Sequence, residues 1–408
     1  MSEKLKNPSK YLGNELKYLA KVLEGEAWSA TVGSWAHGLE AEFAKKIGTK
    51  YGVACNSGTS ALHMALEAVG VGAGDEVISP ALTVIMDSTA TIHANAIPVY
   101  CDVDPQTYLM DPDDLERKIT DKTKAIIVVS LYGGVPDYER ILSIAHEHHI
   151  PVIEDNAQAV LSKWHGKTLG TIGDISCFSF ENSKHISCGE GGMLLTDNEL
   201  YAKAARKLGG HGFKNLQADE GRVRFVNKEM FQNPNYKRHD ELGWNYRMPE
   251  FTAAVAFAQM ERMDQLVELR EKNAEIFLDA ISDCEYLIPQ KNLPGTVNSY
   301  YAIGMTYEGE EAIGVPWAEF RRTYVEMGGD GFYGAWSVPY LEPVIKEGTF
   351  AKRLLSVYGN ISYQPGLCPN AESIQPKIMQ FKANYRDLEL AKQKADVLKQ
   401  VIKKFGGK

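Results

Sequence analysis

Short runs rich in valine and isoleucine alternate with longer segments of helical spacing over the first half of the chain. Such runs are typical of strands buried on both faces of a sheet, and the segments between them are typical of β–α–β connections. We therefore predict an α/β fold with a mostly parallel sheet flanked by helices. The expected strands are 51–55, 74–80, 97–103, 124–130, 151–154, 174–180 and 193–196, and the expected helices are 14–25, 35–47, 84–95, 112–119, 137–149 and 198–207.

The pattern changes towards the C-terminus, where a polar segment without regular periodicity is followed by mixed elements and Pro/Gly turns. A loop as long as 209–242 in a compact enzyme is usually functional or disordered. We predict a smaller α+β C-terminal domain at 266–408, after an N-terminal segment and a large domain at 1–265. The expected elements are one long helix from Pro249 to about residue 279, a strand at 300–307, and helices at 316–327 and 387–404.

Reactive polar residues follow two of the expected strands at once. Asp155 and Gln158 come after the run at 151–154, and Ser179 and Lys184 come at and after the run at 174–180. Side chains at the carboxyl ends of strands in an α/β sheet converge in one crevice. We therefore expect these four side chains to share one site.

Lys184 leaves its strand into a glycine-rich turn, where burial can free its amine to form a Schiff base with a carbonyl compound or with pyridoxal phosphate (PLP). The carboxylate of Asp155 then has a natural role beside a pyridine nitrogen. An ordinary ion pair near the sheet edge is an equally good interpretation of either residue alone.

The turn Ser57-Gly58-Thr59 follows the first expected strand and opens an apolar helix. Two hydroxyls, a glycine that admits a ligand close to the backbone, and the unpaired N–H groups of a helix start together form a phosphate cup. A plain N-cap is the favoured alternative for this turn in isolation.

Composition narrows the class of protein. The chain has 408 residues and a net charge of −9, which argues against a nucleic-acid partner. Its first residues contain no long apolar run, so we expect neither a signal peptide nor a membrane span. Six scattered cysteines without a Cys/His cluster predict free thiols, no metal site and a cytoplasmic location. His146, His148 and His149 are interpreted as a solvated helix end.

Five segments, in order, are NSGTSALHMAL, GDEVISPALT, EDNAQA, GTIGDISCFSFENSKHISCGEGGMLLTD and GWNYRMPEFTAAVAFAQMERMD. Together they resemble the DegT-type sugar aminotransferases, which are PLP enzymes of the aspartate aminotransferase fold (fold type I). The resemblance is close over about residues 30 to 270 and loose elsewhere.

The resemblance implies roles for individual residues. Lys184 would carry the cofactor and shuttle protons, Asp155 would pair with the pyridine nitrogen, and Gln158 would lie beside the ring. Val84 stands where the family commonly has an aromatic ring over the cofactor. The phosphate would be held by Gly58, Thr59 and Ser179, with Ser57 a weaker candidate, and by Asn245 of a neighbouring subunit, because family members are dimers with shared sites.

The implied activity is transfer of an amino group, from a donor such as glutamate, to the ketone of a sugar or sugar-like acceptor. The alternatives are a PLP-dependent sugar dehydratase, which in this family carries histidine at the lysine position, a non-catalytic regulatory protein of the same fold, and an unrelated Schiff-base enzyme without PLP. Arg247, Arg321 and Arg322 are the candidates for binding a substrate carboxylate.

The resemblance and the basic residues of the polar segment suggest an acceptor with an anionic handle, such as a nucleotide diphosphate or a phosphate. Positive side chains on a loop can clamp phosphate oxygens by charge-assisted hydrogen bonds. A solvated basic loop is an equally good interpretation. The residues concerned are Lys214, Arg222, Arg224 and Lys228.

Overall fold

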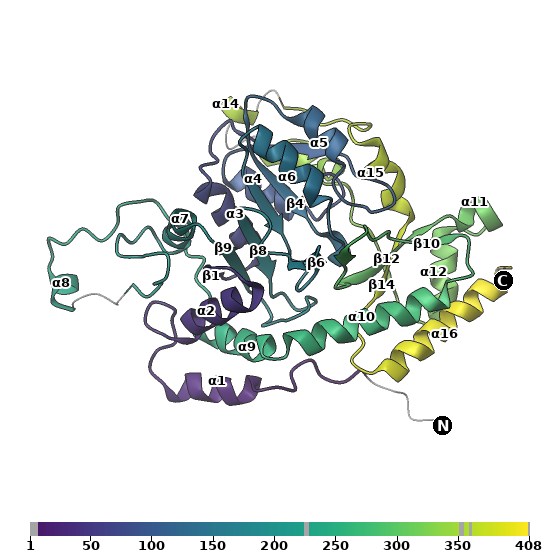
Figure 1. Ribbon diagram of the computed structural model, residues 1–408, viewed down its shortest axis with the longest axis horizontal. Helices are drawn as coiled ribbons and strands as arrows, with labels where there is room; N and C mark the ends of the chain where they lie inside the picture. The colour runs from purple at the N-terminus through teal and green to yellow at the C-terminus, as the bar shows by residue number, and fades with distance from the viewer. Residues whose placement is uncertain (1–6, 224–227, 351–354, 359–360, 407–408) are drawn as a thin grey trace.

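The computed structural model of the chain describes residues 7–223, 228–350, 355–358 and 361–406. A large twisted sheet with helices on both faces forms the main body, and a smaller sheet with its own helices lies at one end (Figure 1). The prediction of a mostly parallel sheet flanked by helices, with a smaller α+β lobe, is confirmed.

The large sheet has seven strands in the order β1-β9-β8-β5-β4-β2-β3. The pairs β2/β3, β2/β4, β4/β5 and β5/β8 are parallel, and β9 runs antiparallel to both of its neighbours. As a result, β1, β8 and β5 end at the same edge of the sheet. The strands are β1 (Tyr51–Cys55), β2 (Glu76–Pro80), β3 (Ile97–Cys101), β4 (Thr123–Val129), β5 (Val152–Asp155), β8 (Ile175–Ser179) and β9 (Gly192–Thr196).

Helices cover both faces of this sheet because its strands are apolar on both sides, as expected for a parallel sheet. One face carries α3 (Gly58–Ala68), α4 (Met86–His93) and α7 (Glu199–Gly209). The other face carries α2 (Trp35–Ile47), α5 (Pro112–Lys118), α6 (Tyr138–Glu147) and α9 (Glu250–Met260). α1 (Glu15–Glu24) packs outside α9.

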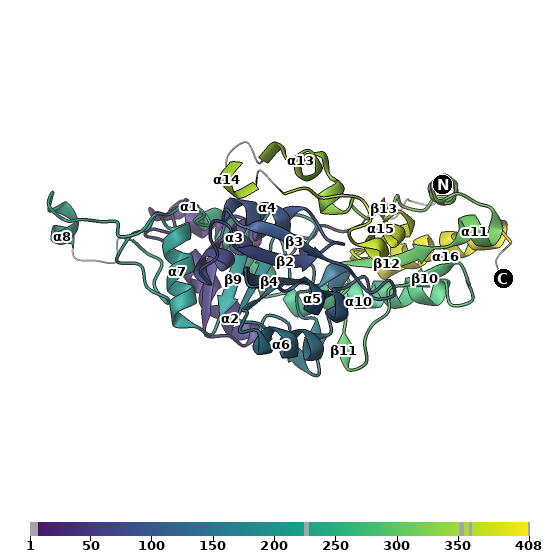
Figure 2. The ribbon, with the colours of Figure 1, turned by 90° about the horizontal axis from the view of Figure 1, so that it is seen from above.

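The smaller sheet is antiparallel and has the order β10-β12-β14-β13. Its aromatic core is closed by α10, α12 and α16, and Figure 2 shows this lobe beside the main body. Its elements are α10 (Met263–Ala280), β10 (Leu287–Pro289), β12 (Ala302–Tyr307), α11 (Gly309–Ile313), α12 (Trp317–Glu326), β13 (Tyr333–Gly334), β14 (Ile378–Lys382) and α16 (Leu388–Lys404). Between β13 and β14, the chain returns to the main body, where α13 (Pro343–Lys346), α14 (Leu355–Tyr358) and α15 (Pro369–Ile374) pack against the large sheet and its helices. A small third sheet joins β6 (Lys163–Trp164), β7 (Lys167–Thr168) and β11 (Thr296–Val297).

The prediction of one long helix from Pro249 to about residue 279 is wrong, because the chain leaves the helical conformation at Arg262 (φ −109°, ψ 10°) between α9 and α10. No glycine or proline marks this break. Instead, Glu261 accepts hydrogen bonds from Asn14 and Tyr18, and Arg262 donates one to the Lys10 carbonyl. Contacts with the N-terminal segment therefore favour the break.

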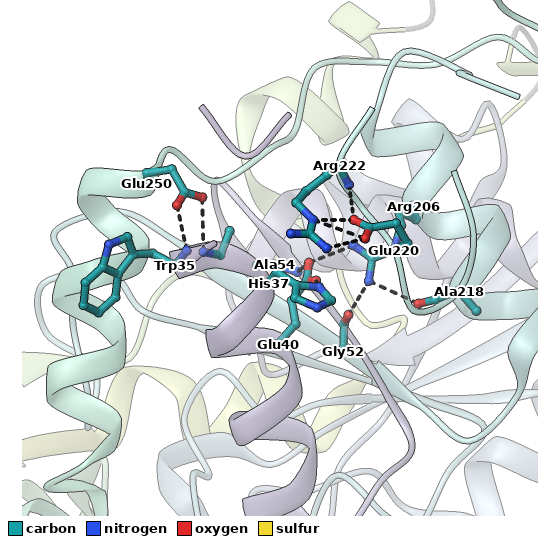
Figure 3. Close-up of polar contacts among 11 residues, drawn as sticks. Trp35, His37, Glu40, Gly52, Ala54, Arg206, Ala218, Glu220, Arg222 and Glu250 are labelled. Carbon is teal, nitrogen blue, oxygen red and sulfur yellow. Dashed lines mark hydrogen bonds and ion pairs between the residues drawn. The ribbon is translucent and has the colours of Figure 1, made fainter. Parts of the chain in front are cut away.

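The polar segment 209–242 reaches outward from the body and contains one short helix, α8 (Lys228–Gln232), which the sequence did not predict (Figure 1). Its near end is anchored by Arg206, which pairs with Glu40 at 2.9 Å and donates to the carbonyls of Gly52 and Ala218 (Figure 3). These three contacts of the Arg206 guanidinium hold the base of the segment against β1 and α2.

Two smaller predictions concern the surface and the thiols. The side chains of His146, His148 and His149 are exposed at the end of α6, as expected. All six cysteines are free, and four of them are buried.

Within the described residues, no helix is both long and apolar enough to cross a membrane.

Candidate active site

A cavity of about 440 Å³ opens at the edge of the large sheet where β1, β5 and β8 end. It is bounded on one side by these strand ends and on the other by the smaller lobe. Every cofactor-site residue predicted from the sequence except Asn245 lines it, namely Ser57, Gly58, Thr59, Val84, Asp155, Gln158, Ser179 and Lys184. The structure thus brings together residues that are separated by more than a hundred positions in the chain.

Asp155 is the last residue of β5 and is almost fully buried, with 4 % of its surface exposed. One of its oxygens accepts a hydrogen bond from the Ala157 N–H at 2.9 Å. Burial raises the pKa of this carboxyl above its ordinary value, although the Ala157 N–H and the charge of Lys184 oppose the rise. A carboxylate so poorly solvated is stabilised by a cationic partner in the cavity.

Lys184 lies in the turn after β8, and its Nζ is 4.6 Å from the centroid of the Tyr301 ring. The backbone of this turn is held in place, because the Lys184 carbonyl accepts hydrogen bonds from Lys10 and from Arg270. Arg270 also binds the carbonyls of Ser183 and Tyr301. The backbone of Lys184 is therefore fixed to both lobes, while its amine faces the cavity.

The turn Ser57-Gly58-Thr59, called the phosphate turn below, lies where β1 and β8 pair with β9. Gly192 pairs with Cys55 at the end of β1 and with Ser179 at the end of β8. A Cβ atom on Gly192 would lie 2.5 Å from the Ser57 backbone, so only glycine lets the strand approach the turn this closely. This contact sets the hydroxyl of Ser179 beside the start of α3.

Ser57 is the N-cap of α3, and its hydroxyl accepts a hydrogen bond from the Ser60 N–H at 3.1 Å. Its oxygen is therefore already engaged, which agrees with its rank as the weaker phosphate candidate. The N–H groups of Gly58 and Thr59 belong to the first turn of the helix, where no intrahelical partner exists. The combination of free N–H groups and a helix start is suited to an anion.

Gln158 is buried below the cavity, and its Oε1 accepts a hydrogen bond from the Tyr132 N–H at 2.8 Å. Tyr132 also lines the cavity and has a positive φ of 60°, a conformation that is uncommon for a bulky residue. This hydrogen bond fixes the Gln158 amide so that its Nε2 remains a donor for a ligand.

The sequence did not predict the wall that the smaller lobe contributes. Tyr301 precedes β12, Trp336 follows β13, and Gln380 lies on β14. The Tyr301 hydroxyl contacts the Ser183 hydroxyl at 2.8 Å, and the Gln380 amide donates to the Gly334 carbonyl. Trp336 keeps 54 % of its surface exposed at the cavity. No local motif marks these residues, because they are separated in sequence from the strand ends that they face.

None of the three candidate arginines lies on the cavity wall. Arg321 donates to the Phe332 carbonyl, and Arg322 pairs with Glu326 on the surface. Arg247 lies in a separate small cavity with Arg206 and Arg222. Within the described residues, the cavity is lined by one basic side chain, Lys184, and by the carboxylates of Asp155, Glu181 and Glu190.

Of the basic residues named in the polar segment, the two whose side chains the structure describes, Lys214 and Arg222, do not line this chain's cavity. Arg222 forms a bidentate pair with Glu220, with Nη2 2.6 Å from Oε2 (Figure 3). The Lys214 amine lies 4.1 Å from the centroid of the Tyr236 ring. Arg224 is outside the described residues, and so is the side chain of Lys228. The described members therefore give no phosphate clamp within one chain.

Asn245 has an exposed side chain and does not line the cavity of its own chain. Its backbone neighbours run beside the phosphate turn, since Tyr246 accepts a hydrogen bond from the Asn56 N–H and Arg247 bridges to Cys55. The segment 243–247 thus borders the site while Asn245 faces outward.

The residues present fit PLP. The lysine amine can bond to the aldehyde. The buried carboxylate, which is short of cationic partners, can pair with the ring nitrogen. The helix start, with a hydroxyl beside it, can bind the phosphate. Fold and site together define the class of PLP enzymes of fold type I.

The comparisons identify the family within this class. Residues 11–316 match the model of the DegT/DnrJ/EryC1/StrS aminotransferase family, so the chain belongs to this family. Aminotransferases of this family depend on PLP, and the chain is a PLP-dependent aminotransferase. The resemblance seen in the five sequence segments is therefore confirmed.

Named relatives act on sugars or cyclitols. The chain is 40 % identical to a GDP-perosamine synthase of Caulobacter vibrioides over 64 % of this chain and 65 % of that one. It is 33 % identical to an L-glutamine:2-deoxy-scyllo-inosose aminotransferase of Streptoalloteichus tenebrarius over 74 % and 70 %. An aminotransferase from Psychrobacter cryohalolentis superposes with a TM-score of 0.85 at 27 % identity, over 99 % and 100 % of the two chains. These relatives support transamination in amino-sugar biosynthesis.

Proposed function

We propose that the protein moves an amino group from glutamate to a ketone on a sugar or sugar-like acceptor. The observation that carries this proposal is the two-sided cavity. One wall holds Lys184, Asp155 and the phosphate turn, and the other presents Tyr301, Trp336 and Gln380. Aromatic and amide side chains are suited to the apolar faces and the hydroxyl groups of a polyol.

When bound, PLP supplies an electron sink for negative charge that develops on the substrate carbon. We propose that Lys184 carries the cofactor, and that its amine would move a proton from the substrate carbon to the cofactor in the donor half of the reaction and in the opposite direction in the acceptor half. Asp155 balances positive charge on the ring nitrogen. The position of Lys184 at the end of β8, opposite the smaller lobe, supports this role.

We propose the remaining cofactor contacts for residues that line the same cavity. Gly58, Thr59 and Ser179 bind the phosphate, and Ser57 holds the helix start in shape. Gln158 donates to the phenolic oxygen, and Val84 contributes an aliphatic contact to the ring face. Each of these residues lines the cavity.

We further propose that the active unit is a homodimer in which Asn245 completes the phosphate site of the partner. The exposed side chain of Asn245 and the outward reach of the segment 209–242 support this arrangement (Figure 1). Exposed apolar side chains close to Asn245 also support an interface there, because Leu242 and Trp244 are 86 % and 51 % exposed.

The charge of the wall bears on the acceptor. Three carboxylates and a single amine line the described part of the cavity. This balance favours an uncharged polyhydroxylated group in the part of the acceptor that this chain contacts. Any anionic handle would then be held outside the described wall or by the partner.

The test is to load the purified enzyme with an amino donor and then to offer a panel of ketones. Glutamate and glutamine are compared as donors, and loading is followed by the loss of the visible absorption band. The panel contains nucleotide-linked 4-keto sugars, keto-hexose phosphates, keto-inositols and simple 2-keto acids. Return of the band with a sugar or cyclitol ketone is expected, whereas return with simple 2-keto acids alone would contradict the proposal.

A further inference from the structure

Asp87 is a buried acid that the sequence pattern did not single out. It lies in the first turn of α4, and its side chain has no exposed surface. Thr83, Val84 and Met86 next to it all line the cavity. Asp87 thus lies directly behind the cavity wall, on the side where β5 delivers Asp155.

The hydrogen bonds of Asp87 leave one oxygen unsatisfied. Its Oδ2 accepts a hydrogen bond from the Thr83 hydroxyl at 2.7 Å. Its Oδ1 is buried and has no donor among the described residues. The Asp155 carboxyl lies close enough to the Asp87 carboxyl for a side-chain hydrogen bond between the two groups. Two carboxylate oxygens are both acceptors, so a proton between them is needed to satisfy the contact.

The surroundings determine which carboxyl holds that proton. Burial and the nearby Asp155 charge raise the pKa of Asp87 well above its ordinary value. Asp155 has the Ala157 N–H and the charge of Lys184 to stabilise its ionised form. Other titratable groups that interact with the pair are Tyr100 on β3, Tyr138 on α6 and Cys177 on β8, and burial raises the pKa of all three, so they are neutral.

We propose that Asp87 is a positioning residue that stays protonated and donates a hydrogen bond to Asp155, so that the pair carries one negative charge directed at the ring nitrogen of the cofactor. This inference rests on the proposed pairing of Asp155 with that nitrogen. The shared proton prevents Asp155 from turning away from the cavity, and it limits how strongly Asp155 can attract a proton from the ring.

The first test uses the apoprotein, so that it does not depend on the proposed function. A group that keeps its proton in the folded state but loses it in the unfolded state makes folding less favourable as pH rises from its unfolded pKa to its folded pKa. The folding constant should then fall by up to about tenfold for each pH unit above about pH 4. Asp87→Asn removes this contribution and retains a donor for Asp155.

The free energy of unfolding of the apoprotein is therefore measured with a chemical denaturant from pH 4.5 to 8. This range lies above the unfolded pKa of about 4. The stability of the Asp87→Asn variant relative to wild type should rise with pH. An exposed control, Asp121→Asn, should run parallel to wild type. Parallel curves for Asp87→Asn and wild type would overturn the proposal.

A second measurement gives its first result on the wild type alone. Infrared spectra of the wild-type apoprotein at neutral pH should contain the carbonyl stretch of a protonated carboxylic acid. This band should persist in the Asp121→Asn control and disappear in Asp87→Asn. Its absence from the wild type would contradict the shared proton.

The third test concerns the cofactor and compares two variants. Asp87→Asn should keep PLP affinity and the pH titration of the bound cofactor's visible band near those of the wild type. Asp87→Ala should weaken PLP binding about tenfold and shift that titration, because one buried hydrogen bond to a charged group is lost. Equal effects of the two variants would show that the side chain only fills space. If the apoprotein tests succeed and Asp155→Asn retains normal turnover, the pair is real and the proposed function fails instead.

Discussion

The two walls of the cavity are built in different ways. The cofactor wall consists of the ends of β1, β5 and β8 and the turns that follow them, and its side chains occur in short, ordered motifs. The wall that we propose for the acceptor, called the acceptor wall below, consists of Tyr301, Trp336 and Gln380, which come from three separate strands or loops of the smaller lobe. One wall is organised by local chain direction, and the other is organised by how two lobes pack.

We propose that the cofactor wall provides the chemistry and that the acceptor wall provides the selectivity for the ketone. The strand ends bring Lys184, Asp155 and the start of α3 to one edge of the sheet, and we propose that this arrangement serves the transamination chemistry. The smaller lobe contributes aromatic and amide groups without a motif. We expect changes on the cofactor wall to stop both half-reactions, and changes on the acceptor wall to affect one.

The largest effect is expected for Lys184→Ala. Both half-reactions should slow by at least about 10³-fold, because the group that moves the proton is removed. The fold should be kept, as judged by circular dichroism. Borohydride reduction of the wild-type holoenzyme followed by peptide mass spectrometry should locate the cofactor on Lys184. The control is Lys167→Ala, which lies outside the cavity lining, and a cofactor adduct on any other lysine would contradict the assignment.

The next effect is expected for Asp155→Asn. The neutral amide cannot balance a protonated ring nitrogen, so kcat should fall by about 10²- to 10³-fold while PLP still binds. Single-turnover rates with donor and with acceptor should fall together. A variant with nearly normal rates in both halves would show that the carboxylate is structural.

A smaller effect is expected for Asn245→Ala, which asks whether the cofactor wall is complete within one chain. Loss of one hydrogen bond to a charged phosphate costs about 1.5–3 kcal/mol, so the Kd for PLP should rise about tenfold or more. Asn235→Ala is the matched control, because Asn235 is an exposed asparagine in the neighbouring polar segment 209–242.

Mixed dimers sharpen the same test. Refolding Lys184→Ala together with Asn245→Ala subunits should restore one intact site in each hybrid, and measured activity should exceed that of either parent. Absence of any recovery in verified hybrids would contradict a shared site.

The smallest effect is expected for Trp336→Ala on the acceptor wall. Loss of an aromatic contact of about 0.5–1.5 kcal/mol should raise KM for the ketone by about three- to tenfold. The rate of loading by the amino donor should remain unchanged. Tyr333→Ala is the matched control, because Tyr333 is an exposed aromatic residue on β13 that does not line the cavity. Equal slowing of both half-reactions would remove the distinction between the two walls.

Much of the fold and the cofactor wall could be predicted from the sequence. Runs of β-branched residues between helical segments are sufficient to indicate a parallel sheet, because both faces of such strands must be apolar. Lys184, Asp155 and Ser179 could be placed at one edge, because parallel strands end on the same side. These are consequences of chain direction and short-range pattern.

Tertiary structure decided the rest. The break at Arg262 follows contacts with residues about 250 positions earlier, and no local breaker announces it. From the sequence, Arg222 could be interpreted as part of a phosphate clamp, but in the fold it pairs with Glu220. Trp336 and Gln380 reach the cavity only because the two lobes pack together. Asp87 resembles an ordinary acidic residue in a first helical turn, and its contact with Asp155 depends on how α4 packs against α3 and against β2 and β3 of the large sheet. Long-range contacts of this kind leave no periodic trace in the sequence, so only the folded chain reveals them.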